Sequence, residues 1–517
     1  MKKLKNKLLK NILIILILFL TVSAVIIPRE LNNLDELWNY NFARNIADGL
    51  LPYKDFNMVQ MPLLPIICGT ILKLTFNELI VMRILAVLLI TAILFVTYKI
   101  FENLKINQYI INILIIGIYL LFYKHFCIDY NFGVLLIIII SIYCELKSLS
   151  KGKEILDVSK NDFGLGILVG TSIAFKQTTG IFVSVIFIFY KLLLCSKKED
   201  FRKVFKIIII RLLGVLIPIV LLAIYLSVNN IWNDFLDYTV YSLKTFTNKI
   251  SYLKLVKGNY GLDIAILSIL VPLTFVIMYF IAVCKKIKTD EQKNIFILFC
   301  YSVAAFIVVY PISDSIHFLI GSFPCLISIA YILWLVAKKI AEKSKQKKII
   351  YGSKCFINSF TVISILVFTI YNVVILIQYI SACRGYNELE HFKYIPASSE
   401  SIRKIDNFIL EQNREGKEVY ILDATAAIYM IPIDRYNKDY DMFLKGNIGA
   451  EGEEGQIEKL ENEANTVILI MNENYRRNWQ NPEKVREYII NNWTKVGEIQ
   501  NFDIFQKEKI LKNGKNI

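Results

Sequence analysis

Residues 356–380 read FINSFTVISILVFTIYNVVILIQYI and contain no charged side chain. A run of about 18 or more apolar residues is long enough to cross a bilayer as a helix. Residues 11–27 (NILIILILFLTVSAVII) form a similar run. The chain of 517 residues is 55% hydrophobic and 20% charged, whereas soluble proteins are about 45–50% apolar and about 25% charged. The sequence therefore predicts a polytopic membrane protein and excludes a soluble enzyme, a disordered chain and a disulfide scaffold.

Apolar runs predict eleven membrane spans. The first covers residues 11–27, and the others lie at about 79–98, 109–123, 131–147, 164–175, 178–194, 207–228, 262–284, 294–310, 316–337 and 356–380. Residues 62–76 (PLLPIICGTILKLTF) are too short to cross the membrane, so we expect a helix in the outer interface or dipping into it. The predicted fold class is mainly α, polytopic transmembrane helical, with a small C-terminal extracytoplasmic α/β domain.

The distribution of charge indicates the topology. The net charge is +15, and residues 381–517 contribute 19 basic and 23 acidic side chains, or −4, so the first 380 residues carry +19. Basic clusters occupy alternate connections, at residues 2–10, 99–105, 147–160, 197–206, 285–293 and 338–354. The positive-inside rule places these clusters and the N-terminus inside, and the C-terminus outside. The basic excess is thus a topology signal, and we expect no nucleic-acid partner.

The N-terminal segment resembles a signal peptide, because lysines precede an apolar run and Val22-Ser23-Ala24 would serve as a cleavage site. The apolar run continues to Ile27, which favours an uncleaved first span. Either outcome leaves residue 30 on the outside.

The chain after residue 380 is polar and periodic, which predicts a separate domain. We expect helices at 399–412 and 482–491, strands at 419–423 and 466–471, and one or two strands within 496–505. The domains are therefore 1–380, a transmembrane domain with a first outer loop at about 28–78, and 381–517, an extracytoplasmic α/β domain.

Two sequence features argue against specialised sites. The nine cysteines have no metal-ligand spacing, and only three histidines are present, so the thiols are expected to be small buried hydrophobes. Residues 446–455 are rich in glycine and form either a loop or a phosphate cradle. We favour the loop, because three glutamates there would repel an anion. Residues 232–252 are aromatic-rich and favour an interfacial helix over a substrate groove.

Ionisable side chains gather in connections that the topology places outside. They are Asp35, Glu36, Tyr53 and Asp55 in the first outer loop, Asp129, the Lys176-Gln177 turn, and His317. Carboxylates can accept the proton of a hydroxyl, and cations can neutralise a phosphate leaving group. Their shared side and depth favour one functional site.

Each of these residues also has a structural interpretation. Asp35 and Glu36 could be solvated loop charges or acids at a helix N-terminus, and Asp129 could cap the next span. Lys176 could be an interfacial lysine whose charge reaches water, and His317 could be a hydrogen-bonded interfacial histidine.

The first outer loop carries a resemblance to a known family. Asp35-Glu36, followed by Gly49-x-x-Pro52-Tyr53-x-Asp55 and then Pro62-Leu63, resembles the corresponding loop of GT-C glycosyltransferases. The most similar branch contains bacterial relatives of protein O-mannosyltransferases and of the lipid A aminoarabinose transferase, described as Rgt-like. The Phe175-Lys176-Gln177-Thr178 turn and His317 also have counterparts there. The resemblance covers roughly residues 10–340.

The resemblance implies roles for these positions. The family moves a sugar from a polyprenyl-phosphate donor to an acceptor on the outer face of the membrane. Asp35 is similar to its acceptor-activating base, and Asp129, with Glu36, to its further acidic positions. Lys176 would contact the donor phosphate, with Gln177, His317, Arg83, Tyr53 and Asp55 as further substrate contacts. Some members carry Tyr where this chain has Trp38.

The sequence therefore predicts a hexosyl- or pentosyltransferase in the bacterial plasma membrane. Its partners would be a polyprenyl-phosphate-linked sugar donor, an envelope glycan, lipid or protein acceptor, and membrane lipids. No cofactor is required by the sequence, and a divalent metal is left open. Two alternatives stay open: a transporter or lipid flippase, because Lys176 lies between two short helices, and a non-catalytic assembly subunit that docks partners through its tail.

Overall fold

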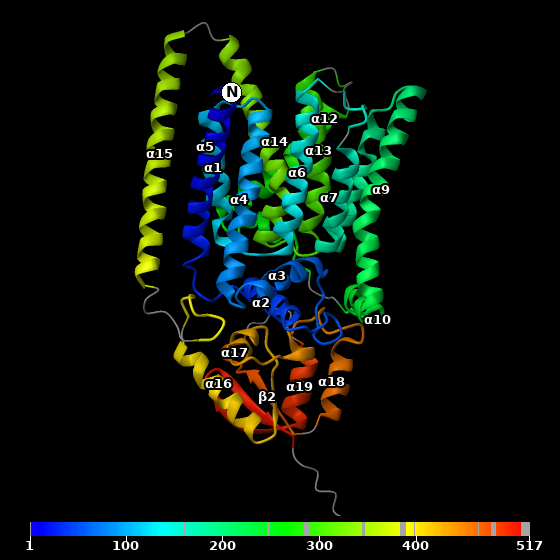
Figure 1. The fold of residues 1–517 in the computed structure, drawn as a ribbon, viewed down its shortest axis with the longest axis vertical. Coiled ribbons are helices and arrows are strands. Elements are labelled where there is room, and N and C mark those ends of the chain that lie inside the picture. Colours follow the sequence, from blue (N-terminus) through cyan, green and yellow to red (C-terminus); the bar gives the residue numbers. More distant parts are fainter. Residues whose placement is uncertain are drawn as a thin grey trace, which may run out of the picture. The chain divides into compact units, whose positions relative to one another are not determined.

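A computed structural model describes residues 2–152, 154–159, 161–245, 249–283, 287, 289–343, 347–382, 389–397, 399–463, 465–476 and 482–507. The chain divides into two compact units, which are described separately. The first unit comprises Met1–Arg29, Arg83–Ile224 and Lys249–Arg384, and the second comprises Glu30–Met82, Tyr225–Asn248 and Gly385–Ile517. Figure 1 shows that helices make up the first unit and that the second contains the sheet.

The first unit is a bundle of long apolar helices. They are α1 (Lys2–Ile26), α4 (Leu79–Asn103), α5 (Gln108–Phe122), α6 (Tyr130–Ser150), α7 (Asp162–Phe175), α8 (Gln177–Phe189), α9 (Lys198–Val228), α12 (Leu262–Ala282), α13 (Asp290–Phe306), α14 (Ser315–Lys343) and α15 (Lys347–Ala382). Ten helices in the described part of the chain are long and apolar enough to cross a membrane. The predicted span at 164–175 forms α7 instead, which has 14 residues and falls short of that length.

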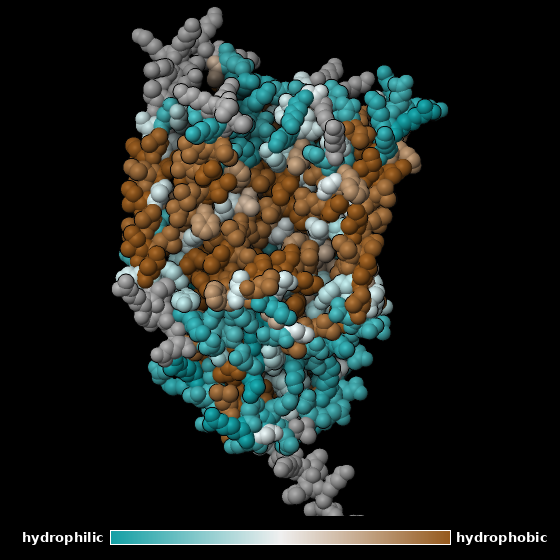
Figure 2. Space-filling model, viewed as in Figure 1, coloured by the Kyte–Doolittle hydropathy of each residue, from teal (hydrophilic) through white to brown (hydrophobic). Residues whose placement is uncertain are grey.

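Successive helices of the bundle run in opposite directions (Figure 1), so their connections alternate between two ends. One end, the Lys10 end, carries the described lysines of the basic clusters and holds Lys10 against Glu102 at 2.8 Å. The opposite end, the Lys176 end, contains the α7–α8 turn and the starts of α6 and α14. Hydrophobic side chains cover the helices between these ends (Figure 2). The structure therefore confirms a multi-pass membrane protein.

Part of the predicted basic and thiol pattern cannot be placed. Outside the described residues lie Lys153, Lys160, Lys285, Lys286, Lys288, Lys345, Cys284, Cys383 and the side chain of Cys355. Among the described residues, six cysteines are free thiols, and four of these are buried: Cys68, Cys127, Cys300 and Cys325. Their burial agrees with the expectation that they act as small hydrophobes.

Close packing holds α7 against α9. A Cβ atom on Gly170 would lie 2.5 Å from the Val215 carbonyl oxygen, and one on Gly166 would lie 2.6 Å from the Arg211 carbonyl oxygen. Only glycine permits this approach of the two backbones, as is common where membrane helices cross.

An ionic cluster is buried beside this crossing. Arg211 of α9 is fully buried, and its Nη2 lies 2.5 Å from Glu145 Oε1 on α6 and 2.7 Å from Asp162 Oδ1 at the start of α7. Its Nη1 donates to the Phe187 carbonyl oxygen of α8 at 2.5 Å. A single guanidinium thus joins four helices, which compensates its removal from water.

The second unit contains a four-stranded sheet in the order β1-β2-β4-β3. The strands are β1 (Glu418–Ile421), β2 (Thr466–Met471), β3 (Thr494–Ile499) and β4 (Phe502–Gln506). β1 and β2 are parallel, with Val419 opposite Val467, and the other pairs are antiparallel. The principal helices are α2 (Leu34–Ala47), α3 (Leu63–Leu74), α10 (Trp232–Thr239), α16 (Ser399–Arg414), α17 (Ala427–Met430), α18 (Gly452–Asn462) and α19 (Glu483–Asn492).

The predicted elements of the tail are confirmed, with one correction. The expected helices and strands correspond to α16, β1, β2, α19, and the β3–β4 pair. The glycine-rich segment 446–455 is not wholly a loop, because α18 begins at Gly452. Two apolar clusters explain the layering: Ile405 and Ile409 of α16 pack with Ile421, while Val485 and Ile489 of α19 pack with other strand residues.

Helix α2 belongs to the same unit as this sheet. The Trp38 indole nitrogen donates to the Ala424 carbonyl oxygen at 2.8 Å, just after β1. The Asn45 amide donates to Asp441 Oδ2 at 3.0 Å, and burial raises the pKa of Asp441 to about 6. The segment after the first span is therefore built into the C-terminal fold by contacts between residues almost 400 positions apart.

Candidate functional site

The α7–α8 turn places Lys176 at one end of the bundle. Lys176 ends α7 and precedes α8, with an extended backbone (φ −153°, ψ 112°) that breaks the helical hydrogen-bonding pattern. A Cβ atom on Gly180 would lie 2.4 Å from the Ile173 backbone, so glycine allows α8 to fold back closely along α7. This tight hairpin fixes the position of the lysine.

The side chain of Lys176 is held by the first turn of α6. Its Nζ donates to Asn131 Oδ1 at 2.7 Å and lies 5.3 Å from the centre of the Tyr130 ring. The side chain is partly buried. Within the described part of the chain, the ammonium makes this one hydrogen bond and no ion pair. An ammonium group has three N–H donors, so two can bind an anionic ligand.

Asp129 adjoins this lysine and caps α6. Its Oδ1 accepts the backbone N–H of Asn131 at 2.7 Å, and its side chain is buried. The structural interpretation as a helix cap is therefore confirmed. Burial raises the pKa of Asp129, while the Asn131 hydrogen bond and the Lys176 charge oppose that rise. The capping role places a carboxylate within electrostatic reach of Lys176.

His317 and Asp314 form a second pair at the same end. The backbone N–H of His317 donates to Asp314 Oδ1 at 2.9 Å, and the ring Nδ1 lies 2.8 Å from that oxygen. Burial tends to raise the pKa of Asp314, but the hydrogen bonds and charge of His317 outweigh it and leave the pKa below its usual value. Asp314 is therefore a stable anion that orients the His317 ring.

Electrostatic coupling joins the two pairs. Burial lowers the pKa of Lys176 to about 8, whereas the carboxylates of Asp129 and Asp314 both favour its charged form. His317 also acts on Asp129. The structure thus brings Asp129, Lys176 and His317 together, as the sequence predicted. A partly dehydrated ammonium in this setting gains strongly from a phosphate oxygen.

Arg83 and Gln177 also lie in the first unit. Arg83 is fully buried, and its Nη1 donates to the Ile27 and Arg29 carbonyl oxygens at 2.9 and 2.5 Å. These bonds tie the end of α1 to α4, which is a structural role. Gln177 is the first residue of α8 and is partly buried.

Asp35 and Glu36 lie in the first turn of α2, in the second unit. Asn33 caps this helix by accepting the Glu36 backbone N–H at 3.1 Å. Asp35 is exposed and Glu36 is buried. Acids are favourable in the first turn of a helix, so the placement of Asp35 and Glu36 agrees with their structural interpretation as acids at a helix N-terminus. Of these two acids, Asp35 alone is accessible to a ligand from solution.

Tyr53 and Asp55 stabilise the following loop. Asp55 Oδ2 accepts the Leu51 backbone N–H at 2.7 Å, and the Tyr53 hydroxyl donates to the Gln60 carbonyl oxygen at 2.7 Å. Tyr53 has a positive φ of 72°, beside Gly49 at 94°. The Gly-x-x-Pro-Tyr-x-Asp pattern therefore encodes a compact turn.

The backbone of the glycine-rich segment 446–455 bonds to a carboxylate of the protein itself. The Ala450 backbone N–H is shared by the two Asp237 oxygens at 3.2 and 3.4 Å, and a Cβ atom on Gly449 would lie 2.7 Å from that carboxylate. A protein carboxylate from α10 thus occupies the place where a phosphate cradle would bind its ligand.

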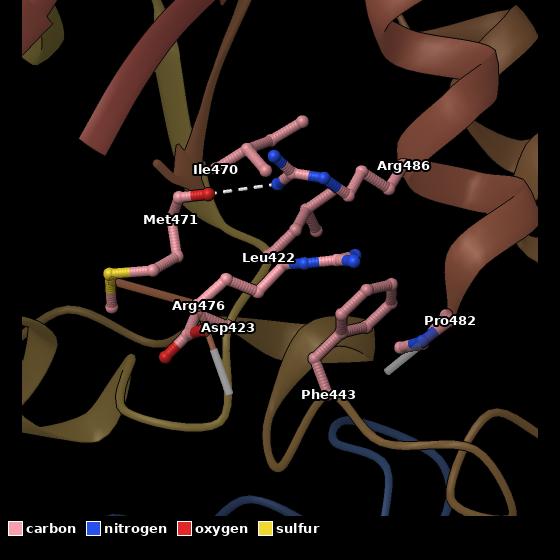
Figure 3. Close-up of a pocket in the computed structure, with 8 residues that line it drawn as sticks. All are labelled: Leu422, Asp423, Phe443, Ile470, Met471, Arg476, Pro482 and Arg486. Carbon is pink, nitrogen blue, oxygen red and sulfur yellow. Dashed lines mark hydrogen bonds between the residues drawn. The ribbon is translucent and has the colours of Figure 1, made fainter. Parts of the chain in front are cut away.

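A small cavity lies where β1 and β2 end (Figure 3). Asp423, Arg476 and Arg486 line it with apolar side chains. Arg476 pairs with Glu483 at 2.5 Å, and Arg486 donates to the Met471 carbonyl oxygen at 2.8 Å and pairs with Glu473 at 2.8 Å. The cavity measures about 20 Å³, which is room for about one water molecule. These arginines therefore serve to join β2 to α19.

Sequence reasoning missed Asn131 and the Arg211 cluster. Asn131 follows Asp129 at the start of a span, and its amide is one of few polar groups there. Arg211 and Glu145 interrupt apolar runs, and ionisable residues inside membrane spans usually have partners. The sequence therefore indicated that Arg211 and Glu145 have partners, but it did not indicate which residues pair with each other.

Known proteins give no assignment for this chain. No protein-family model matches it, and no curated protein matches it. Among the described residues, no three His, Cys, Asp or Glu side chains are grouped to hold a metal ion. The main evidence about function is therefore the Lys176 cluster, which comprises Asp129, Asn131, Lys176, Asp314 and His317.

Proposed function

We propose that this protein is a membrane glycosyltransferase that moves a sugar from a polyprenyl-phosphate donor to a cell-envelope acceptor on the outer face of the plasma membrane. The observation that carries the proposal is the Lys176 ammonium, partly buried and held by Asn131 at 2.7 Å without an ion pair among the described residues. A lipid-borne phosphate must be bound at the membrane interface, and the Lys176 turn lies at the end of a membrane bundle.

The reaction requires a cation and a base. An acceptor hydroxyl attacks the anomeric carbon, the bond from that carbon to the phosphate oxygen breaks, and its electron pair leaves with the phosphate. Lys176 stabilises the negative charge that develops there. We assign the role of the base that accepts the hydroxyl proton to Asp35 on the resemblance of the first outer loop, and its side chain is exposed at the start of α2. Attack opposite the phosphate inverts the anomeric configuration.

The test uses a strain that lacks the protein, complemented with wild-type or variant full-length chain. Lys176→Met removes the cation, and Asp35→Asn removes the base. Lys124→Met is the matched control, because Lys124 is an exposed lysine of the same unit. Mass spectrometry of envelope glycans and lipid-linked sugars is the readout. We expect both variants, but not the control, to lose the glycan sugar and accumulate its lipid-linked donor.

A transporter is the second candidate, because the broken α7–α8 pair with a lysine at its turn resembles the interrupted helices near transport sites. Purified protein in liposomes distinguishes the two. Movement of a lipid-linked sugar across the bilayer, with no glycoside formed and with normal glycoside synthesis in the Asp35→Asn strain, would contradict the transferase proposal.

A further inference from the structure

The bundle contains a cavity that the proposed reaction does not use, and its lining on α1 begins one helical turn from Lys10. It measures about 160 Å³ and lies between α1, α5 and α15, which Figure 1 shows side by side. Its wall is mainly apolar and includes Ile14 and Ile17 of α1, Ile115 and Ile116 of α5, and Phe368 of α15. A cavity of this composition inside a membrane bundle suits a hydrocarbon chain.

The faces of α1 and α5 that line the cavity are most polar near Lys10. Lys10, Ile14, Ile17 and Thr21 recur at spacings of three and four residues, so they share one face of α1. The matching face of α5 begins with Gln108, and the Lys10 ammonium donates to its side-chain oxygen at 2.7 Å. The apolar part of both faces therefore starts directly behind a lysine.

Charge at this polar end is positive. Lys10 and Lys99 both contact Glu102, which leaves one positive charge in excess. Lys10 also lies 5.6 Å from the centre of the Tyr98 ring. Its side chain is 44% exposed, and Glu102 and Gln108 take two of its three donors, so the third can reach a ligand at the membrane surface. Anionic headgroups are attracted to such sites.

The stretch of α1 from Lys10 to Thr21, at the far end of the cavity, is about as long as one leaflet is thick. From Lys10 to Thr21 the helix rises about 16 Å, which is about half of the ~30 Å hydrocarbon core. At the far end of this stretch, the Tyr119 hydroxyl donates to the Thr21 carbonyl oxygen at 3.2 Å. A chain that enters beside Lys10 would therefore end near the middle of the bilayer.

We propose that α1, α5 and α15 hold one anionic phospholipid of the leaflet on the Lys10 side, with its phosphate at Lys10 and part of one acyl chain in the cavity. The site is independent of the Lys176 cluster and of the proposed transferase activity. Its occupant is a bilayer lipid, because an apolar cavity near an exposed cation matches a molecule with a hydrocarbon chain and an anionic headgroup.

Native mass spectrometry of the full-length protein tests the site. The protein is exchanged into nanodiscs of phosphatidylcholine that contain a minority of phosphatidylglycerol. We expect wild type to retain one phosphatidylglycerol. Lys10→Gln should weaken retention about fivefold, from the loss of about one lysine's attraction. Ile115→Trp should abolish retention by filling the cavity.

Lys5→Gln is the matched control. Lys5 is an exposed lysine of α1, five residues from Lys10 and therefore on a different face of the helix. Its replacement should leave retention unchanged. Equal loss in Lys5→Gln and Lys10→Gln would show non-specific attraction and overturn the proposal. Retention of phosphatidylcholine instead, or unchanged retention in both Lys10→Gln and Ile115→Trp, would also overturn it.

Discussion

The Lys176 ammonium donates a 2.7 Å hydrogen bond to the side-chain oxygen of Asn131, so the turn between α7 and α8 is bonded to the first turn of α6. The same Asn131 gives its backbone N–H to Asp129. One residue therefore sets the position of both a cation and a carboxylate, and the predictions below begin from it.

Replacing Lys176 by Met should lower sugar transfer by about 10²–10³-fold, because one preorganised charge at a leaving group contributes about that much. Lys176→Arg should keep more activity than Lys176→Met, since it retains the charge. Initial rates with a defined polyprenyl-phosphate sugar in membranes measure this. Equal activity of the wild-type and Met chains would remove Lys176 from the mechanism.

Asn131→Asp should raise the KM for the donor more than it lowers kcat. The new carboxylate would pair with Lys176 and compete with the phosphate of the donor. Asn131→Ser, which keeps a small acceptor without charge, is the control and should give a smaller change. An unchanged donor KM in the Asp variant would show that Lys176 does not bind the phosphate.

The pH dependence of transfer should report Lys176. Its pKa of about 8 means that the lysine is cationic below pH 8 and loses its charge as the pH rises, with about one tenth still charged at pH 9. We expect kcat/KM, which reflects the free enzyme, to fall over this range. Lys176→Arg should keep its kcat/KM to higher pH, because arginine stays charged. A parallel decline in both proteins would contradict the assignment.

Asp406 should make the second unit less stable at neutral pH than at acidic pH. Burial raises the pKa of this α16 carboxyl to about 7, above its unfolded value of about 3.9. A raised acid pKa favours the protonated folded state, so stability falls as the pH rises from about 4 through 7. Asp406→Asn should reduce this loss between pH 5 and pH 8, measured as the thermal unfolding midpoint of the full chain.

Gly170→Ala should destabilise the bundle by about 1–3 kcal/mol, because its methyl group would lie 2.5 Å from the Val215 carbonyl oxygen and force α7 away from α9. Gly164→Ala in the same helix is the control, since its Cβ would meet nothing within 4 Å. Thermal unfolding in detergent compares the two. Equal midpoints would mean that α7 and α9 do not pack as described.

Local patterns predicted most of the elements, because hydropathy and periodicity act over short stretches of chain. The long apolar runs became long helices, and β2 has the bounds that its buried pattern predicted. The break at Lys176 was visible because a lysine is costly inside an apolar run.

Contacts between distant residues could not be predicted in the same way. The bond from Trp38 to Ala424 joins residues 386 positions apart, and no periodicity signals such a pair. Tyr53 and Asp55 are predicted substrate contacts, and the hydrogen bonds by which their polar atoms close a turn could not be predicted from the sequence. The start of α18 was not predicted, because glycines weaken a helical pattern in the sequence. In the structure Gly452 has a positive φ of 63° at that boundary, a conformation that favours glycine.

Arg211 contacts Asp162 where α7 begins and Phe187 near the end of α8. These contacts lie at the two open ends of the hairpin whose closed end is Lys176, about 15 Å away along α8. Arg211→Lys would keep the charge, but a single ammonium could bond to only one of these two helices, so the other would lose its contact. The geometry of Lys176, the lysine that we propose binds phosphate, would then depend on the fully buried side chain of Arg211.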